Sequence, residues 1–493
     1  MESAPAILPN ELVVHAFEAL GAKFAYFGKT GDIAKIDGDT FAVIRAYENG
    51  DSPSLEDAIT VLPESKRAAM SARFAILAAN GLLERQPPLS KEREQERVDR
   101  LFEHNPRNLM FLVTEACNLA CTYCYEVENG VHDQPGTFKK VDAEKAIDAY
   151  LTEAAPRGYA CITFFGGEPL LNFEVVKHIV AYSKGKAAEL GMEVGYSITT
   201  NLTLMTEEAA DLLASNHFSI MLSIDGPKHI HDRNRVGKCS ATALGTHDLI
   251  IRNLKVLMEK CGQYGTRMPK LRATVTRPEE FEEVEDYLYS LGTGFVEIGT
   301  ADFKEEDLDG PHCPSESPAK TKADPIREME GRYEAVWERM KQGDRSDIAP
   351  SIAKGMRKLA EQLQNVGPRE EAEPLLCGVC RNMKAITPNG DLYPCHRYVG
   401  MENFKVGNLH QGGLDEHRVR DYYGKVFESF RNKCSQCWAR HLCGGQCSWE
   451  LSTEDGEVGR PKDEWCRNIK RGLEVRLAMF AHSRELTSEP QEV

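Results

Sequence analysis

The middle of the chain alternates between short apolar runs and longer segments with helical periodicity, and this alternation limits the possible folds more than any other feature. Segments such as VDAEKAIDAYLTEA and NFEVVKHIVAYSKGKAAEL separate the apolar runs. The apolar runs are LMFLVTE (109–115), ACITFF (160–165), EVGYSITT (193–200), FSIMLSI (218–224), KLRATVT (270–276) and FVEIGT (295–300). Six such β-α units predict an α/β fold with a parallel sheet, which places chemistry at the carboxyl ends of its strands.

Length and composition exclude several classes of protein. The 493 residues predict about two to four compact units. No apolar run approaches the roughly 20 residues that span a bilayer, and the N-terminus, MESAPAILPNELVVHAFEAL, lacks the pattern of a signal peptide. We therefore expect a cytoplasmic protein. The net charge of −16 argues against nucleic acid and against an anionic membrane surface as partners.

The 15 cysteines are distributed unevenly, and in a long chain without a signal peptide they favour metal-bound thiolates over disulfides. One group consists of Cys117, Cys121 and Cys124, and a dense second group lies between residues 377 and 466. Four other cysteines have no partner at ligand spacing, and we expect them to be buried or incidental thiols. These are Cys161, Cys239, Cys261 and Cys313.

The second group has the spacing C-x2-C-x9-G-x4-C, then C-x2-C-x5-C-x3-C, then one last cysteine. Its members are Cys377, Cys380, Cys395, Cys434, Cys437, Cys443, Cys447 and Cys466. Eight thiolates fill two four-cysteine sites, and their spacing alone leaves structural zinc and iron–sulfur clusters equally open. The three cysteines of the first group cannot complete a zinc site without a distant ligand, whereas a four-iron cluster on three thiolates keeps one iron free.

The C-x3-C-x2-C loop after a strand resembles the signature of the radical S-adenosylmethionine (radical SAM) enzymes. The resemblance implies a partial (β/α)6 TIM-like barrel over residues 107–310. It also implies a 4Fe-4S cluster on Cys117, Cys121 and Cys124 whose free iron binds S-adenosylmethionine. An electron from that cluster would cleave the cofactor and yield a 5′-deoxyadenosyl radical that abstracts hydrogen from carbon.

Two further segments resemble cofactor contacts of this family. Gly166, Gly167, Glu168 and Pro169 resemble the GGEP motif that contacts the cofactor's amino group, since glycines let the backbone approach and a carboxylate accepts from an ammonium. A tight turn is the alternative. Thr199, Thr200 and Asn201 resemble residues that contact the ribose, and a capped helix start is the alternative.

The fourth strand leads into LSIDGPKHIHDRNRV, which also resembles the family's site. Ser223, Asp225 and Arg235 resemble residues that line the cofactor carboxylate and the peptide, and Tyr123 belongs to the same predicted set. Arg235 suits a carboxylate because its donors form a fork. Asp225 is the candidate catalytic residue, because an acid beside the cofactor can accept the proton of a substrate thiol. Orienting the cofactor or capping a loop are the alternatives for Asp225.

The second cysteine group, within residues 376–470, resembles the SPASM domain of peptide-modifying radical SAM enzymes. The resemblance implies two auxiliary 4Fe-4S clusters, and therefore three clusters in all. The first auxiliary cluster would be held by Cys377, Cys380, Cys395 and Cys447. The second would be held by Cys434, Cys437, Cys443 and Cys466. Full thiolate ligation favours electron transfer over direct substrate binding.

The segment PCHRYVG narrows the expected reaction. Sulfatase-maturing relatives carry a base, aspartate, after the cysteine that corresponds to Cys395, whereas this chain has His396. The pattern resembles maturases that form thioethers, and the overall arrangement is similar to the maturases of quinohemoprotein amine dehydrogenase, which join cysteine to acidic residues. Carbon–carbon cross-linking and formylglycine formation remain alternatives. A non-catalytic zinc or iron–sulfur scaffold that binds a peptide is the other alternative.

The flanking regions predict a recognition unit and connecting helices. Within residues 1–86, two short strands around KTGD and three helices resemble a winged-helix-like unit that captures a leader peptide as an added strand, with a packing cap as the alternative. The resemblance implies a peptide or small protein with a leader as substrate and a flavodoxin- or ferredoxin-type reductant. The other predicted regions are a linker (87–106), a helical bridge (311–375) and a C-terminal helix with a tail (471–493).

Overall fold

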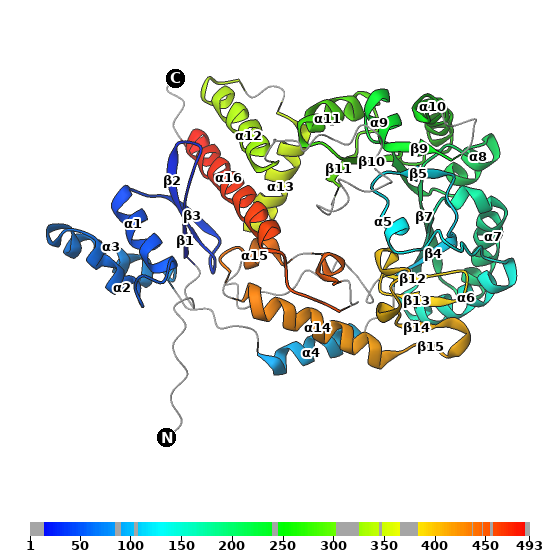
Figure 1. Ribbon diagram of the computed structural model, residues 1–493, viewed down its shortest axis with the longest axis horizontal. Coiled ribbons are helices and arrows are strands. Elements are labelled where there is room, and N and C mark those ends of the chain that lie inside the picture. The colour runs from blue at the N-terminus through cyan, green and yellow to red at the C-terminus, as the bar shows by residue number, and fades with distance from the viewer. Residues whose placement is uncertain are drawn as a thin grey trace.

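The computed structural model describes residues 14–83, 90–102, 107–238, 245–301, 325–344, 348–364, 383–435, 437–445, 447–453 and 457–488. The N-terminal unit (blue) and the β-α region (cyan to green) lie at opposite sides of the molecule in Figure 1. Helices α12 (Pro325–Lys341), α13 (Pro350–Gln364) and α16 (Asp463–Ser488) lie between them on one side, with α14 (Glu416–Cys434) on the other.

The N-terminal unit is a three-stranded antiparallel sheet followed by helices. Strands β1 (Val14–Ala19), β2 (Ala22–Phe27) and β3 (Asp32–Lys35) pair in chain order. The two strands expected around KTGD are β2 and β3, and β1 is a third strand that the sequence reading did not include. The helices are α1 (Gly38–Glu48), α2 (Leu55–Ala58) and α3 (Glu64–Ala79).

Both faces of this small sheet are buried along β1 and β2, because these two strands carry mostly apolar residues. Val14, Ala25 and Phe27 pack against α1, α2 and α3. Phe17, Phe24 and other residues of the opposite face join a hydrophobic cluster formed with α12, α13 and α16. The N-terminal unit is therefore packed against the C-terminal helix as well as being connected to the rest of the chain by the linker.

Six parallel strands form the centre of the large sheet, as the alternation of the sequence predicts. They are β4 (Asn108–Thr114), β6 (Tyr159–Gly166), β7 (Glu193–Thr200), β8 (Ser219–Ser223), β10 (Lys270–Val275) and β11 (Val296–Thr300). The strand order is β11-β10-β8-β7-β6-β4, so each unit adds a strand on the same side and the sheet stays open. The predicted α/β fold with a central parallel sheet is confirmed.

Helices follow the strands and cover the outer face of the sheet in Figure 1. These are α6 (Lys140–Ala154), α7 (Phe173–Glu189), α8 (Glu207–Ser215), α10 (His247–Tyr264) and α11 (Phe281–Ser290). Short elements lie near the carboxyl ends of the strands. They are β5 (Leu119–Cys121), α5 (Tyr125–Glu128), α9 (Lys228–Asn234) and β9 (Arg235–Gly237).

The large sheet continues beyond the β-α region into the cysteine-rich segment. Strand β12 (Met383–Ile386) pairs in parallel with β4, with Met383 opposite Asn108 and Ile386 opposite Phe111. Strands β13 (Asp391–Tyr393), β14 (Gly407–Asn408) and β15 (Gly413–Leu414) then add antiparallel to the edge, giving ten strands in all among the described residues. A single hydrophobic core runs through both regions.

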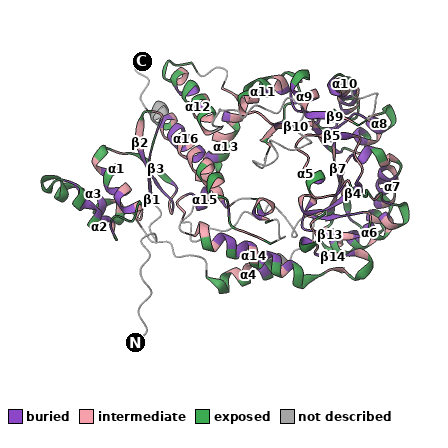
Figure 2. Ribbon diagram, viewed as in Figure 1, coloured by how far each residue is buried: buried purple, intermediate pink, exposed green. Residues whose placement is uncertain are grey.

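The remaining helices connect these parts. Helix α4 (Lys91–Phe102), in the predicted linker, lies beside α14, and α15 (Arg440–Cys443) follows α14. Figure 2 shows α3 and α4 exposed over much of their surface, whereas the strands of the large sheet are mostly buried. Within the described parts of the chain, every helix is too short or too polar to cross a membrane.

Candidate active site

The first cysteine group follows β4 at the carboxyl edge of the sheet. Cys117, Cys121 and Cys124 are all partly buried. Burial raises the pKa of Cys117 to about 12, and the neighbouring thiols of Cys121 and Cys124 add to that rise. The three sulfurs therefore lie within electrostatic range of one another, and in the metal-free chain they are thiols. Such a set fits an iron–sulfur cluster, because bound iron deprotonates a coordinating thiol.

The GGE segment after β6 packs against the backbone that enters the cysteine loop. The Gly167 N–H donates to Thr114 O at 3.0 Å, and the Glu168 N–H donates to Ala116 O at 2.9 Å. A Cβ on Gly167 would lie 2.2 Å from Ala116 O, so a side chain cannot fit there. The need for two glycines at this point thus comes from the close approach of two backbones.

Glu168 is buried and holds the next strand end in place. Its Oε1 accepts from the Thr200 hydroxyl at 2.7 Å and from the Leu170 N–H at 3.1 Å, and its Oε2 accepts from the Asn201 N–H at 2.7 Å. Burial raises the pKa of Glu168 to about 7, although these hydrogen bonds lower it. Pro169 begins the short 3-10 helix that carries Leu170.

Asn201 belongs to a polar network that includes residues not predicted from the sequence. Its side-chain amide donates to Asn118 Oδ1 at 3.0 Å, and its Oδ1 accepts from the Thr203 hydroxyl at 2.6 Å. Asn118 in turn donates to the Thr203 hydroxyl at 2.8 Å. Asn118 lies inside the cysteine loop, and its place in CNLAC was the available signal. Thr199 lies half-buried on β7 and contributes none of these bonds.

Asp225, Tyr123 and Arg235 form a buried group beside the cysteine loop. The Tyr123 hydroxyl donates to Asp225 Oδ2 at 2.6 Å, and the Thr274 N–H donates to Asp225 Oδ1 at 3.0 Å. Arg235 Nε lies 3.1 Å from Asp225 Oδ2 as an ion pair. The Asp225 side chain is fully buried, so its two oxygens face these three partners. Ser223 ends β8 and is half-buried.

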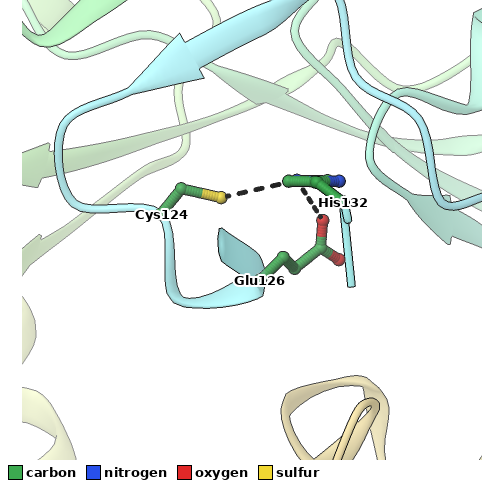
Figure 3. Close-up of side chains that lie close together, drawn as sticks. All are labelled: Cys124, Glu126 and His132. Carbon is green, nitrogen blue, oxygen red and sulfur yellow. Dashed lines mark hydrogen bonds and ion pairs between the residues drawn. The ribbon is translucent and has the colours of Figure 1, made fainter. Parts of the chain in front are cut away.

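A second cluster of titratable side chains surrounds Cys124, the last cysteine of the loop. Figure 3 shows Cys124, Glu126 and His132 pointing toward one another. His132 Nε2 lies 3.9 Å from Cys124 Sγ and 3.4 Å from Glu126 Oε2, while Nδ1 donates to Glu115 O at 2.5 Å. Burial raises the pKa of Glu126 to about 7, and the nearby Glu115 carboxylate adds to this. Neither Glu126 nor His132 was among the predicted site residues.

The structure brings the ligands of the predicted second auxiliary cluster together. Burial raises the pKa of Cys434 to about 12, and the thiols of Cys437, Cys443 and Cys466 each add to the rise. These four cysteines come from the end of α14, the following turn, α15 and α16. Their juxtaposition suits a four-thiolate site.

The predicted first auxiliary cluster is described only in part. Cys395 and Cys447 both act on the pKa of Tyr398, which burial raises well above its usual value, so both sulfurs lie near that ring. Cys377 and Cys380 lie outside the described residues.

His396 follows Cys395 in the chain, and its ring packs against the end of β6. Its ring centroid is 4.4 Å from that of Phe165, at the end of β6, and 6.1 Å from that of Tyr125. Arg397 stacks over the Tyr125 and Trp449 rings at 5.2 and 4.5 Å. Burial lowers the pKa of His396 to about 3, so its imidazole is neutral at physiological pH.

Comparison with protein families decides the identity of these two cysteine regions. Residues 111–300 match the radical SAM superfamily, and residues 377–438 match SPASM, described as an iron-sulfur cluster-binding domain. The chain carries a radical SAM domain followed by a SPASM domain. Its cysteine groups and the buried Glu168 fit the S-adenosylmethionine and iron–sulfur clusters that these domains bind.

Similar proteins from several organisms match most of the length of this chain. An uncharacterized protein of Archaeoglobus fulgidus is 28% identical, covering 79% of this chain and 84% of the relative. The serine-type anaerobic sulfatase-maturating enzyme of Bacteroides thetaiotaomicron is 25% identical, covering 70% of this chain and 84% of that enzyme. The cysteine-type anaerobic sulfatase-maturating enzyme of Clostridium perfringens is 24% identical, covering 73% of this chain and 93% of that enzyme.

A solved structure shares the fold. Native anSMEcpe with bound AdoMet superposes with a TM-score of 0.57 at 21% sequence identity, covering 77% of this chain and 99% of that chain. About a quarter of this chain therefore lies outside the shared fold.

Proposed function

We propose that this chain is a radical SAM maturase that forms intramolecular thioether cross-links in a peptide or small protein. The observation that carries the proposal is the convergence, at one edge of the sheet, of the three-cysteine loop, the Gly167–Glu168 turn and the buried Asp225–Arg235 pair. His396, which replaces an acidic base, then favours thioether formation among the reactions of this class. Bound S-adenosylmethionine and its cluster would supply a radical that abstracts hydrogen from carbon.

In this proposal residues at the carboxyl ends of β6, β7 and β8 would hold the cofactor. Glu168 would hold its amino group, because a buried carboxylate with a raised pKa gains a favourable charged partner when an ammonium arrives. Asn201 and Thr199 would face the ribose, and Ser223 and Arg235 the carboxylate. The hydrogen bonds among Glu168, Thr200 and Asn201 hold two of these strand ends in register before any ligand binds.

Cross-linking requires the substrate to lose two hydrogens. One leaves a carbon as a hydrogen atom, the other leaves the cysteine thiol as a proton, and the sulfur–carbon bond that forms releases one electron. The electron would pass to an auxiliary cluster, since full thiolate ligation suits electron transfer. Asp225 is the proposed acceptor of the thiol proton. To accept it, the Asp225 carboxylate would exchange one of its present hydrogen-bond donors for the substrate thiol.

The ring of His396 supports this reaction over aldehyde formation. The family resemblance implies a carboxylate base at this point in sulfatase-maturing enzymes, whereas the buried imidazole of His396 is uncharged. Its contacts with Phe165 and Tyr125 place it between the radical SAM domain and the auxiliary cysteines, where a substrate side chain would pass. A neutral ring there cannot supply the anionic base that formylglycine formation uses.

A second candidate is oxidation of a serine or cysteine to formylglycine, as in anaerobic sulfatase maturation. The similarity to the two sulfatase-maturating enzymes, each over more than two thirds of this chain, favours it. The two reactions differ in their products. A thioether removes an alkylatable thiol and creates no carbonyl, whereas formylglycine is an aldehyde that reacts with a hydrazide.

The N-terminal unit is the proposed site for the leader of the substrate. Strand β3 is the edge of its sheet and its residues are largely exposed, so its outer side is where we propose that a leader adds as a further strand. A flavodoxin- or ferredoxin-type protein is the proposed electron donor.

The first test is the anaerobic iron and sulfide content with the EPR spectrum of the reduced protein, before and after addition of S-adenosylmethionine. We expect about twelve irons per chain and a signal that changes with the cofactor. Zinc in place of iron, or an unchanged spectrum, would overturn the proposal. With a candidate peptide, a loss of two hydrogens together with loss of one alkylatable thiol identifies a thioether, and hydrazide labelling identifies formylglycine.

A further inference from the structure

A two-stranded sheet that the sequence did not predict brings Arg235 to the cysteine loop. Strands β5 and β9 are antiparallel, and Cys121 is the register partner of Arg235. Hydrogen bonds extend the pairing at both ends, because the Thr122 N–H donates to Asn234 O at 3.0 Å and the Lys238 N–H donates to Asn118 O at 3.0 Å. Backbone hydrogen bonds therefore hold the centre of the cysteine loop against the segment that follows α9.

The Arg235 guanidinium lies against three groups of the site. Its Nη1 donates to Cys121 Sγ at 3.9 Å, its carbon atom Cζ lies 5.5 Å from the centroid of the Tyr123 ring, and Asp225 is its ion-pair partner. The residue is only 7% exposed. Because a guanidinium stays protonated in proteins, a permanent positive charge is buried beside one cysteine of the loop.

We propose that Arg235 is a positioning residue of the first cluster, which donates to the Cys121 thiolate and stabilises the negative charge that reduction adds. This rests on the proposed assignment of that cluster to Cys117, Cys121 and Cys124. Hydrogen bonds to the sulfurs and nearby charge both set the reduction potential of iron–sulfur clusters. Asp225 limits the effect, because its carboxylate neutralises part of the guanidinium charge.

The two partners predict shifts of opposite sign. Arg235→Gln removes the charge, so the midpoint potential of the first cluster becomes more negative. Asp225→Asn leaves Arg235 less compensated, so the potential becomes more positive. A tenfold change in the relative stability of the reduced form corresponds to about 59 mV for a one-electron couple. The measurement is an EPR-monitored redox titration of the reconstituted full chain without S-adenosylmethionine.

Arg233→Gln is the matched control. Arg233 lies two residues away and its guanidinium is ion-paired with Glu280 instead of Asp225, so its loss of charge should leave the potential unchanged. Arg235→Lys retains the charge and should keep the potential between those of the wild type and Arg235→Gln. If Arg235→Gln does not retain the cluster, the proposal is tested by Asp225→Asn alone, in which the midpoint potential should become more positive.

Two outcomes overturn the inference. One is an unchanged potential in both variants while Arg235→Gln weakens S-adenosylmethionine binding, which would mean that Arg235 contacts only the cofactor. The other is a shift of the same sign in both variants, which would indicate a general disturbance of the loop. A wild-type protein whose EPR signal does not respond to S-adenosylmethionine would instead refute the proposed function, so the two failures are distinguishable.

Discussion

At the scale of single residues, close backbone approach determines which side chains the site tolerates. Gly166 has a φ of 123°, and a Cβ there would lie 2.2 Å from Thr114 O. Gly167 is excluded from carrying a side chain by Ala116 and by the backbone nitrogen of Cys117, 2.8 Å from its Cβ position. Both contacts are with backbone atoms that lead into the cysteine loop, and these atoms cannot swing aside as a flexible side chain would.

Gly167→Ala should therefore disturb the first cluster. Relief of the clash must shift the backbone before Cys117, and overpacking of this kind costs about 1–3 kcal/mol or more. We expect a lower free energy of unfolding in urea and loss of iron from the first cluster. Gly185→Ala in α7 is the control, because among the described residues nothing outside the local helix backbone lies within 4 Å of its Cβ position, and alanine favours a helix by about 0.5–1 kcal/mol. Equal stability of the two variants would contradict this account.

Asp225→Asn should remove cross-linking while leaving the iron content of the chain unchanged. The amide keeps the volume of the carboxylate but cannot accept a thiol proton as a base, and loss of general base catalysis typically costs about 100-fold or more in rate. Product formation by mass spectrometry, together with iron analysis, checks this. A variant with full cross-linking activity would remove Asp225 from the chemistry.

At the scale of elements, long periodic segments were predictable and very short ones were not. The six parallel strands and the helices between them follow from apolar periodicity. Strands β5 and β9 have three residues each, which is too short for a period-2 pattern to stand out. The sequence did not predict strand β1, because VHAFEA carries apolar residues on both faces and lacks the alternation of a half-buried strand. Its two apolar faces fit the structure, in which helices pack on both sides of the sheet.

The docking of the N-terminal sheet should depend on pH through His15. This buried ring bonds Glu48 of α1 at 2.5 Å and Glu474 of α16 at 3.0 Å, and it stacks on Trp438 at 4.0 Å. Burial alone would lower the pKa of His15, but the two carboxylates raise it above 6.5. The stabilisation is therefore complete below about pH 6.5 and is lost as the pH rises through the folded-state pKa.

His15→Gln tests this dependence. Hydrogen bonds to charged groups contribute about 1.5–3 kcal/mol, so the variant should be less stable than the wild type by about 2 kcal/mol at pH 6 and by less at pH 8. Urea unfolding at both pH values measures the difference. His229→Gln is the control, because that side chain is 65% exposed. A difference between wild type and His15→Gln that stays constant with pH would mean that the ring acts only by packing.

At the scale of the whole molecule, the two domains share one sheet and one core. Strand β12 covers the edge of β4, so the buried run Leu109–Val113 has the SPASM segment as its neighbour on one side. Helix α16 contributes Cys466 to the second auxiliary group and also packs against the N-terminal sheet. The sequence-based boundary between a cluster domain ending at residue 470 and a separate C-terminal helix falls inside this continuous helix.

A chain ending at residue 382 should therefore fail to form a stable radical SAM domain. The truncation exposes the edge of β4 and part of the shared core, and an unpaired apolar edge strand promotes aggregation. Size-exclusion chromatography and limited proteolysis check this, with full-length protein as the reference. A monomeric, protease-resistant fragment would show that the domains fold independently.

The sequence by itself determined the α/β class, the order of the six parallel strands along the chain and the position of both cysteine groups, because periodicity and ligand spacing are local properties. Only the tertiary structure decided that Cys121 faces Arg235, that Glu168 holds Thr200 and Asn201, that Glu126 and His132 lie beside Cys124, and that β12 extends the sheet. These contacts join segments that are far apart in the chain. They depend on burial and on backbone approach, which no local pattern encodes.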